Sequence, residues 1–273
     1  MTKDKSVLVC GIGETASAVA RRLFLEGYAV ALHRAAPPRM LRRGMCFADA
    51  WFDMRALLDG VEARRADVAA EFLLGLQSRN FIPLLRARLW DVIERWPWDV
   101  IVAAREEGEP TAPSLRDLAE LSIGLGEGFV AGEDCDLVVE TDGPDPGTIL
   151  RPGEARRKRR ATSGSAPGHC EALAPRPGLF RAKARIGAMV QAGETLGFVL
   201  DTPVLAPVAG RVKGMARREQ AVGKGAPIVE IALSRKASVV GVGEAAQAAS
   251  RGAAFAVEME LEGWKPMSFE NWS

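Results

Sequence analysis

The stretch that decides the fold is residues 6–33, which read SVLVCGIGETASAVARRLFLEGYAVALH. A short apolar run at residues 6–10 leads into a segment whose apolar residues recur every three or four positions, as on one face of a helix. Gly27 ends that segment, and a second apolar run follows at residues 28–32. A strand, a helix and a strand in this order predict a β-α-β unit with parallel strands and a right-handed crossover.

The same alternation continues to about residue 150. Helical patterns near residues 66–77 and 89–95 each precede a short apolar run, and further apolar runs occupy residues 121–125 and 136–140. Strands that alternate with helices over such a length form a sheet that is covered on both faces. The sequence therefore predicts an α/β fold class, with a Rossmann-like parallel sheet domain in residues 1–150.

The rest of the chain divides into three regions. Five consecutive cations followed by Ser, Gly and Pro predict a basic flexible connector at residues 151–170. Short apolar runs between Gly and Pro turns predict a small all-β barrel or sandwich domain at residues 171–233. Residues 234–273 return to a helical pattern, and we expect this tail to pack back on the first domain.

The predicted small β domain resembles biotinyl and lipoyl carriers. The resemblance is carried by the turn at residues 190–194, VQAGE, and by the segment APVAG at residues 206–210. Such carriers present a modifiable lysine at a hairpin tip, whereas the tip here reads Leu200-Asp201-Thr202-Pro203. We therefore expect a carrier-like shape with no covalent biotin or lipoate.

Composition excludes several classes of function. The chain has 273 residues, of which 36 are Lys or Arg and 35 are Asp or Glu, and this balance argues against a general nucleic-acid binder. No window approaches 18 apolar residues, and the first apolar run is too short for a signal peptide, so a cytoplasmic protein without a membrane partner is expected. Four scattered cysteines and two histidines predict no metal site.

The first glycine loop, residues 11–16, fits the pattern G-x-G-x-x-A between a strand and a helix. Its glycines permit a tight turn and a close approach of the ligand, and the helix N-terminus can hold a phosphate. The second strand, however, ends in Arg34 rather than in the acidic residue that binds ribose hydroxyls, and Glu14 would face a pyrophosphate with the wrong sign. Arg34 suits a 2′-phosphate, so bound NAD or NADP and a glycine turn that serves fold geometry alone both stay open.

A second glycine cluster occupies residues 123–129, IGLGEGF. Both clusters are expected at carboxyl ends of strands, where ligands of open α/β sheets bind, so they could line one crevice. The alternative is that these glycines serve tight turns only. The candidate ligand-binding residues are Gly11, Gly13, Glu14, Thr15, Arg34, Gly124, Gly126 and Gly128.

Residues 122–141, SIGLGEGFVAGEDCDLVVET, resemble the signature I-G-L-G-P-G-F-x-A-G-x-D-x-x-x-V-V-E-T of the selenium-dependent molybdenum hydroxylase accessory proteins. Residues 42–50, RRGMCFADA, resemble a second segment of that family. The resemblance implies a protein that supports maturation or cofactor handling of a molybdenum-dependent hydroxylase, with that client enzyme as partner and a nucleotide-type or molybdopterin-type ligand. The chain departs from the family at residues 142–145 and 105–108, where DGPD and REEG replace polar family motifs.

Four further residues are candidate contacts for a ligand or a partner, namely Arg42, Arg43, Cys46 and Glu140. Because cations stabilise a thiolate, the neighbouring arginines are expected to lower the pKa of Cys46. Cys135 lies between two aspartates, which raise a thiol pKa, so Cys46 is the better candidate for a reactive thiol, the alternative being that it is a buried structural thiol.

Three classes of function thus remain open at the level of sequence. The first is an accessory protein that binds a small anionic ligand or a client enzyme in a glycine-lined crevice. The second is an NAD(P)-dependent oxidoreductase, and the third is a non-catalytic interaction scaffold with a carrier-like barrel. Whether the chain catalyses a reaction, and whether it forms a homo-oligomer, also stays open.

Overall fold

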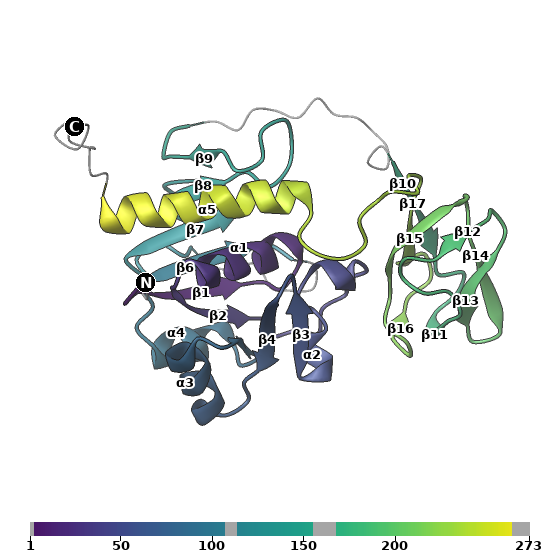
Figure 1. Cartoon of the computed structure of the whole chain (residues 1–273), viewed down its shortest axis with the longest axis horizontal. Coiled ribbons are helices and arrows are strands. Elements are labelled where there is room, and N and C mark those ends of the chain that lie inside the picture. Colours follow the sequence, from purple (N-terminus) through teal and green to yellow (C-terminus); the bar gives the residue numbers. More distant parts are fainter. Residues whose placement is uncertain (1–2, 107–113, 155–167, 264–273) are drawn as a thin grey trace, which may run out of the picture.

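The computed structural model describes residues 3–106, 114–154 and 168–263. The described chain forms a large sheet with helices on both faces and, beside it, two small sheets (Figure 1). The five cations at residues 156–160 and most of the predicted connector lie outside the described residues. The flexibility of the connector therefore stays a prediction.

The large sheet is mixed, with the strand order β3-β4-β5-β2-β1-β6-β7-β8-β9. All neighbouring strands from β4 to β8 pair in parallel, whereas β3 and β9 run antiparallel to their neighbours at the two edges. The strands are β1 (Ser6–Cys10), β2 (Ala29–His33), β3 (Arg55–Leu58), β4 (Val61–Arg65), β5 (Ile82–Leu85), β6 (Val100–Ala104), β7 (Leu121–Leu125), β8 (Leu137–Val139) and β9 (Ile149–Leu150). The predicted α/β class is confirmed.

Helices cover both faces of this sheet, which is why its central strands are apolar on both sides. Along β1, Val7 and Val9 pack into the core beneath α1 (Glu14–Leu25) and α5 (Glu244–Glu262), which lie side by side (Figure 1). Leu8 points to the opposite face, where its core includes residues of α3 (Ala69–Ser78) and α4 (Leu89–Arg95). A short 3-10 helix, η1 (Arg43–Met45), and α2 (Ala50–Asp53) follow β2.

The region after residue 168 forms two four-stranded antiparallel sheets, β10-β17-β15-β12 and β14-β13-β11-β16, around a core of its own. Their strands are β10 (His169–Leu173), β11 (Gly178–Ala182), β12 (Met189–Val190), β13 (Thr195–Val199), β14 (Thr202–Leu205), β15 (Gly210–Met215), β16 (Ala221–Val222) and β17 (Pro227–Ala232). The expected barrel resembling a biotinyl or lipoyl carrier is not shown. The short strands predicted from sequence are present, but they pair in two separate sheets.

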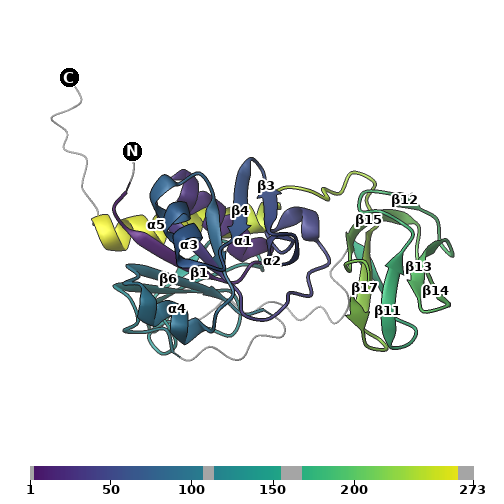
Figure 2. The ribbon, with the colours of Figure 1, turned by 90° about the horizontal axis from the view of Figure 1, so that it is seen from below.

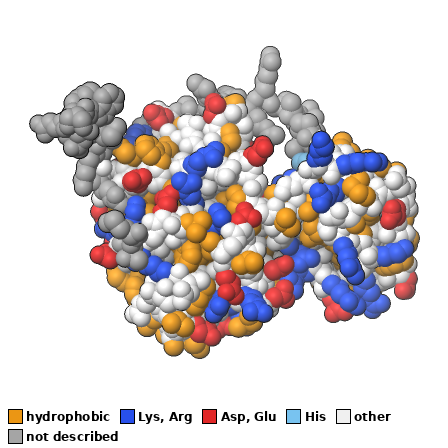
Figure 3. Space-filling model, in the orientation of Figure 1, with side chains coloured by type: hydrophobic (Ala, Val, Ile, Leu, Met, Phe, Trp, Pro, Cys, Tyr) orange, Lys and Arg blue, Asp and Glu red, His pale blue; other side chains and the backbone are white. Residues whose placement is uncertain are grey.

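Charge is distributed unevenly over the surface. Figure 3 shows Lys and Arg side chains gathered over the small sheets, whereas both signs are mixed over the large sheet. The exposed cations of the small sheets and their turns include Arg176, Arg181, Lys183, Arg185, Arg218 and Lys224. Within the described ranges, no helix is long and apolar enough to cross a membrane. The same ranges bring together no group of three or more His, Cys, Asp or Glu that could hold a metal ion.

Candidate functional site

The loop between β1 and α1 lies where the order of strands reverses. β1 pairs with β2 on one side and with β6 on the other, so the carboxyl end of β1 borders the position at which open α/β sheets bind ligands. Gly11 leaves the strand with φ +124°, a value that a residue with a side chain rarely adopts. Gly13 is the N-cap of α1 and supplies no side chain to the free N–H groups of the first turn.

The carboxylate of Glu106, two residues beyond the end of β6, occupies this loop. Its Oε1 accepts hydrogen bonds from the backbone N–H of Ile12 at 2.8 Å and of Gly13 at 2.6 Å. A Cβ added at Gly11 would lie 2.7 Å from the same oxygen, and a Cβ at Gly13 would lie 2.9 Å from it. The two glycines are therefore needed so that a carboxylate can reach the amides at the N-terminus of α1.

Arg34 is a third donor to this carboxylate. Its guanidinium, with 0% of the side chain exposed, donates from Nη1 to Glu106 Oε2 at 3.0 Å, and the Glu106 side chain is 6% exposed. Arg34 Nε donates to the carbonyl of Ala36 at 3.0 Å, and the Arg34 carbonyl accepts from Trp51 Nε1 at 3.2 Å. The arginine is thus fixed in place, and the buried carboxylate of Glu106 compensates its charge.

The second glycine cluster lies on the other side of the segment after β6. Gly126 and Gly128 have φ values of +72° and +90°, and each faces a side chain of the protein. A Cβ at Gly126 would collide with Thr141, and a Cβ at Gly128 would lie 2.6 Å from Cδ of Arg105. The Arg105 guanidinium lies 4.9 Å from the centre of the Phe129 ring. Residues 105 and 106 therefore separate the two loops, with Glu106 against the first and Arg105 against the second.

The remaining glycine of that cluster, Gly124, lies within β7 and is packed by protein atoms. A Cβ there would lie 2.5 Å from Cβ of Phe129 and 2.9 Å from Sγ of Cys135. Glu140 follows β8, and its backbone pairs with Thr148 and Gly147. The geometry thus brings Gly11, Gly13 and Arg34 together, whereas Gly124 serves close packing.

The parts that hold the large sheet and the small sheets lie side by side (Figure 2), and two of the predicted contact residues form hydrogen bonds between them. Arg42 donates from Nε and Nη2 to the two carboxylate oxygens of Glu230, both at 2.6 Å, and from Nη1 to Glu14 at 3.1 Å. The hydrogen bonds with Glu230, which is 4% exposed, raise the pKa of Arg42 above its usual range. Arg43 donates to Asp49 at 3.0 Å and to the carbonyl of Met215 at 3.1 Å.

Glu14 and Thr15 lie in the first turn of α1. Because Glu14 is paired with Arg42, its negative charge is compensated close to the helix N-terminus. The expected repulsion between Glu14 and an anion at the loop is therefore reduced by an ion pair that the sequence alone does not reveal.

The prediction that Cys46 has a lowered pKa is wrong. Cys46 is 2% exposed, and its burial raises the pKa of the thiol to about 12. Its Sγ lies 3.6 Å from the carbonyl oxygen of Arg42, whose guanidinium is turned toward Glu230 instead. Cys135 is also buried, and burial, followed by the charges of Asp134 and Asp136, raises its pKa to about 11. Neither thiol is activated as a nucleophile.

Glu106 is the functional candidate that the sequence analysis missed. In the sequence it is part of the segment REEG, residues 105–108, which departs from a family motif. The available signal was its position, immediately after an apolar strand that neighbours the glycine-loop strand in a parallel sheet. A carboxylate at such a carboxyl end is placed to meet the helix N-terminus.

No family model matches this chain. Uncharacterized protein YqeB from Escherichia coli (strain K12) is 31% identical over 233 residues, which cover 82% of this chain and 42% of that protein. The chain therefore spans about two fifths of the length of this relative.

Two solved structures align with most of the chain. A succinylglutamate desuccinylase/aspartoacylase from Rhodobacter sphaeroides is 16% identical, with a TM-score of 0.27, and the alignment covers 84% of this chain and 85% of that one. A succinylglutamate desuccinylase from Silicibacter sp. TM1040 is 15% identical, with a TM-score of 0.25, and the alignment covers 85% and 86%. TM-scores this low assign neither a fold nor an activity to this chain.

These comparisons overturn the resemblance to the selenium-dependent molybdenum hydroxylase accessory proteins. No family model of such accessory proteins matches the chain, and the relative that does match is an uncharacterized protein. The predicted roles in hydroxylase maturation, in cofactor handling and in NAD(P)-dependent oxidoreduction are therefore wrong. The scaffold with a carrier-like barrel is also set aside, because that barrel is not shown.

Proposed function

We propose that this chain binds a small phosphorylated molecule at the loop between β1 and α1, and that Glu106 holds this site closed until the ligand displaces it. The observation that carries the proposal is the position of the Glu106 carboxylate, which takes the place of an anionic ligand at a Rossmann-like glycine loop. The chain's own carboxylate marks the site and also competes for it.

Three hydrogen-bond donors at this position favour an anion. Two backbone N–H groups, of Ile12 and Gly13, and the Nη1 of Arg34 converge on one carboxylate, at the positive end of a helix of 12 residues. Each of these features stabilises negative charge.

A phosphate matches this donor set better than a carboxylate does. It can accept the same three hydrogen bonds that the Glu106 carboxylate accepts, and it offers more acceptor oxygens and carries more negative charge. The Gly11 and Gly13 positions, where a Cβ would reach the bound oxygen, leave room for such a group once the Glu106 side chain has turned away.

Occupation of the loop by Glu106 weakens the apparent affinity of the protein for the ligand by an amount that follows from the fraction of open protein. A ligand that binds the open form alone loses affinity in proportion to the fraction of open protein. A preference of about 1.4 kcal/mol for the closed form would weaken binding about tenfold. Removal of the carboxylate should therefore strengthen phosphate binding, whereas removal of a ligand-binding group would weaken it.

The test uses pyrophosphate as the probe in isothermal titration calorimetry. We expect wild-type protein to bind it and the Glu106→Ala variant to bind it about tenfold or more tightly. Glu120→Ala is the matched control, because Glu120 is a half-exposed carboxylate at the opposite end of the parallel strands, where it pairs with Lys5. Binding by the Glu106→Ala variant but not by wild-type protein would show that the Glu106 carboxylate occupies the loop permanently and cannot be displaced by a ligand, and this would refute the proposal. Absence of binding in both proteins would refute it as well.

A further inference from the structure

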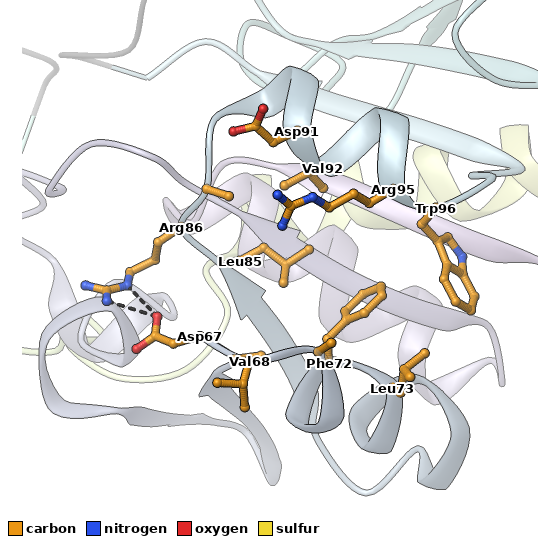
Figure 4. Close-up of a pocket in the computed structure, with 13 residues that line it drawn as sticks. Asp67, Val68, Phe72, Leu73, Leu85, Arg86, Asp91, Val92, Arg95 and Trp96 are labelled. Atoms are coloured by element: carbon orange, nitrogen blue, oxygen red, sulfur yellow. Dashed lines mark hydrogen bonds and ion pairs between the residues drawn. The ribbon is translucent and has the colours of Figure 1, made fainter.

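A pocket of about 520 Å³ lies on the other side of β2 from the glycine loop. It is formed by α3, by α4 and by the segments that follow β4 and β5 (Figure 4). Its volume is in the range of sites for small organic molecules, and apolar side chains form most of its wall.

The two carboxylates of this pocket are already compensated. Asp67 accepts two hydrogen bonds from the Arg86 guanidinium, at 3.1 and 2.9 Å, and the same guanidinium lies 4.9 Å from the centre of the Trp51 ring. Asp91 accepts from Arg88 at 3.1 and 3.2 Å. Neither acid is therefore available to neutralise a further cation completely.

Arg95 is such a cation. Its guanidinium points into the pocket between Val92 and Leu85 (Figure 4). Among the residues that the structure describes, Arg95 has no partner within hydrogen-bond or ion-pair distance, and its interaction with Asp91 is a longer-range attraction. An arginine that faces a pocket in this way presents a planar set of donors that suits a carboxylate.

Aromatic and aliphatic side chains surround that guanidinium. Phe72 and Trp96 meet edge to face, with ring centres 5.4 Å apart, at one end of the pocket. Leu85 lies beneath the guanidinium, and Val68, which is 57% exposed, closes the wall near α3 (Figure 4). An apolar wall of this kind favours a flat, apolar body next to the charged group.

We infer that this pocket binds an aromatic carboxylate, whose carboxylate pairs with Arg95 and whose rings lie against Phe72 and Leu85. One uncompensated cation matches one negative charge, and the carboxylates of Asp67 and Asp91 at the rim disfavour a ligand of higher negative charge. This site is separate from the glycine loop and does not depend on the function proposed for that loop.

The first test compares 2-naphthoate with its neutral analogue 2-naphthamide in calorimetric titrations of the full chain. We expect the acid to bind about tenfold or more tightly than the amide, because the charged hydrogen bonds to Arg95 are made with the acid alone. Arg95→Gln should remove this preference. Arg251→Gln is the matched control, because Arg251 is likewise an exposed arginine on a helix, α5, and lies far from the pocket in sequence and in the fold.

A second pair of variants varies the charge of the pocket without removing Arg95. Val68 is the N-cap residue of α3, with extended backbone angles, and both Asp and Asn are good residues at such a position. Val68→Asp should weaken binding of 2-naphthoate severalfold relative to Val68→Asn, and should leave 2-naphthamide unaffected.

Three results would overturn the inference. They are equal affinities of acid and amide for wild-type protein, an unchanged preference in Arg95→Gln, and no binding of 2-naphthoate at millimolar concentration. Circular dichroism melts of each variant confirm that a loss of binding is not a loss of fold.

Discussion

Replacing Glu106 with alanine removes the carboxylate that pairs with the buried Arg34 guanidinium and that accepts hydrogen bonds from the N–H groups of Ile12 and Gly13. Loss of one partner of a buried ion pair typically costs about 3–5 kcal/mol. Because the Glu106 side chain is 6% exposed, water can enter the vacated space, and we expect the lower end, about 3 kcal/mol. In a chain of this size that corresponds to a decrease of about 6–12 °C in the melting temperature.

Small anions should reverse this destabilisation, because they can occupy the vacated site. Acetate at a hundred times its dissociation constant would restore about 2.7 kcal/mol. The assay is thermal and urea denaturation of wild-type protein, Glu106→Ala and the control Glu120→Ala, with acetate or with an equal concentration of chloride. If Glu106→Ala is as stable as wild-type protein, or if acetate stabilises the control as much as the variant, the anion site inferred from these contacts does not exist.

Three further predictions concern other parts of the structure. Gly11→Ala should destabilise the protein by clearly more than the roughly 1 kcal/mol expected for Gly60→Ala. An added Cβ at Gly60 (φ +84°) meets no atom of the described residues within 4 Å, whereas one at Gly11 lies 2.7 Å from Glu106. Equal losses of stability in urea denaturation would contradict the close approach of Glu106. Cys46 and Cys135 should react with iodoacetamide at pH 8 no faster than the protein unfolds, since burial raises their pKa values to about 12 and about 11, and fast labelling of the folded protein would refute the burial argument. Because these raised pKa values belong to the folded state, the free energy of unfolding should also fall as the pH rises from the ordinary thiol pKa of 9.0 toward 12. Glu230→Gln should lower the free energy of unfolding by about 2 kcal/mol or more, because it weakens the pair with Arg42. The control Glu171→Gln, at an exposed position opposite Glu230 on β10, should change the free energy of unfolding by no more than about 0.5 kcal/mol. Similar effects of the two substitutions would show that the pair of Arg42 and Glu230 does not hold the large-sheet and small-sheet parts together.

The central strands of the large sheet could be predicted from the sequence because they are buried on both faces. β7 (Leu121–Leu125) coincides with the predicted apolar run at residues 121–125. The edge hairpin of β3 and β4 was missed, since arginines and glutamate interrupt its apolar pattern. Its two-residue turn, Asp59-Gly60, with φ values of +42° and +84°, is a typical hairpin signal that was available.

The sequence predicts one part of the candidate site, the glycine loop, but not the carboxylate of Glu106 that binds to it. The glycine loop is a local pattern, and its position between a strand and a helix follows from the periodicity around it. Glu106, by contrast, reaches Gly13 from 93 residues further along the chain, and such a contact depends on how strands β1 and β6 pair. The raised pKa of Cys46 was missed for a related reason, because neighbouring charges can be read from the sequence whereas burial by distant elements cannot.

The central claim, that the β1–α1 loop is an anion site which a phosphorylated ligand takes over from Glu106, is tested most directly by nuclear magnetic resonance. The measurement follows the backbone amide signals of Ile12 and Gly13 in wild-type protein during titration with pyrophosphate. The account predicts that both signals shift and saturate together, with the dissociation constant found by calorimetry. Pyrophosphate binding that leaves both amide signals unchanged, or a titration without any binding, would contradict it.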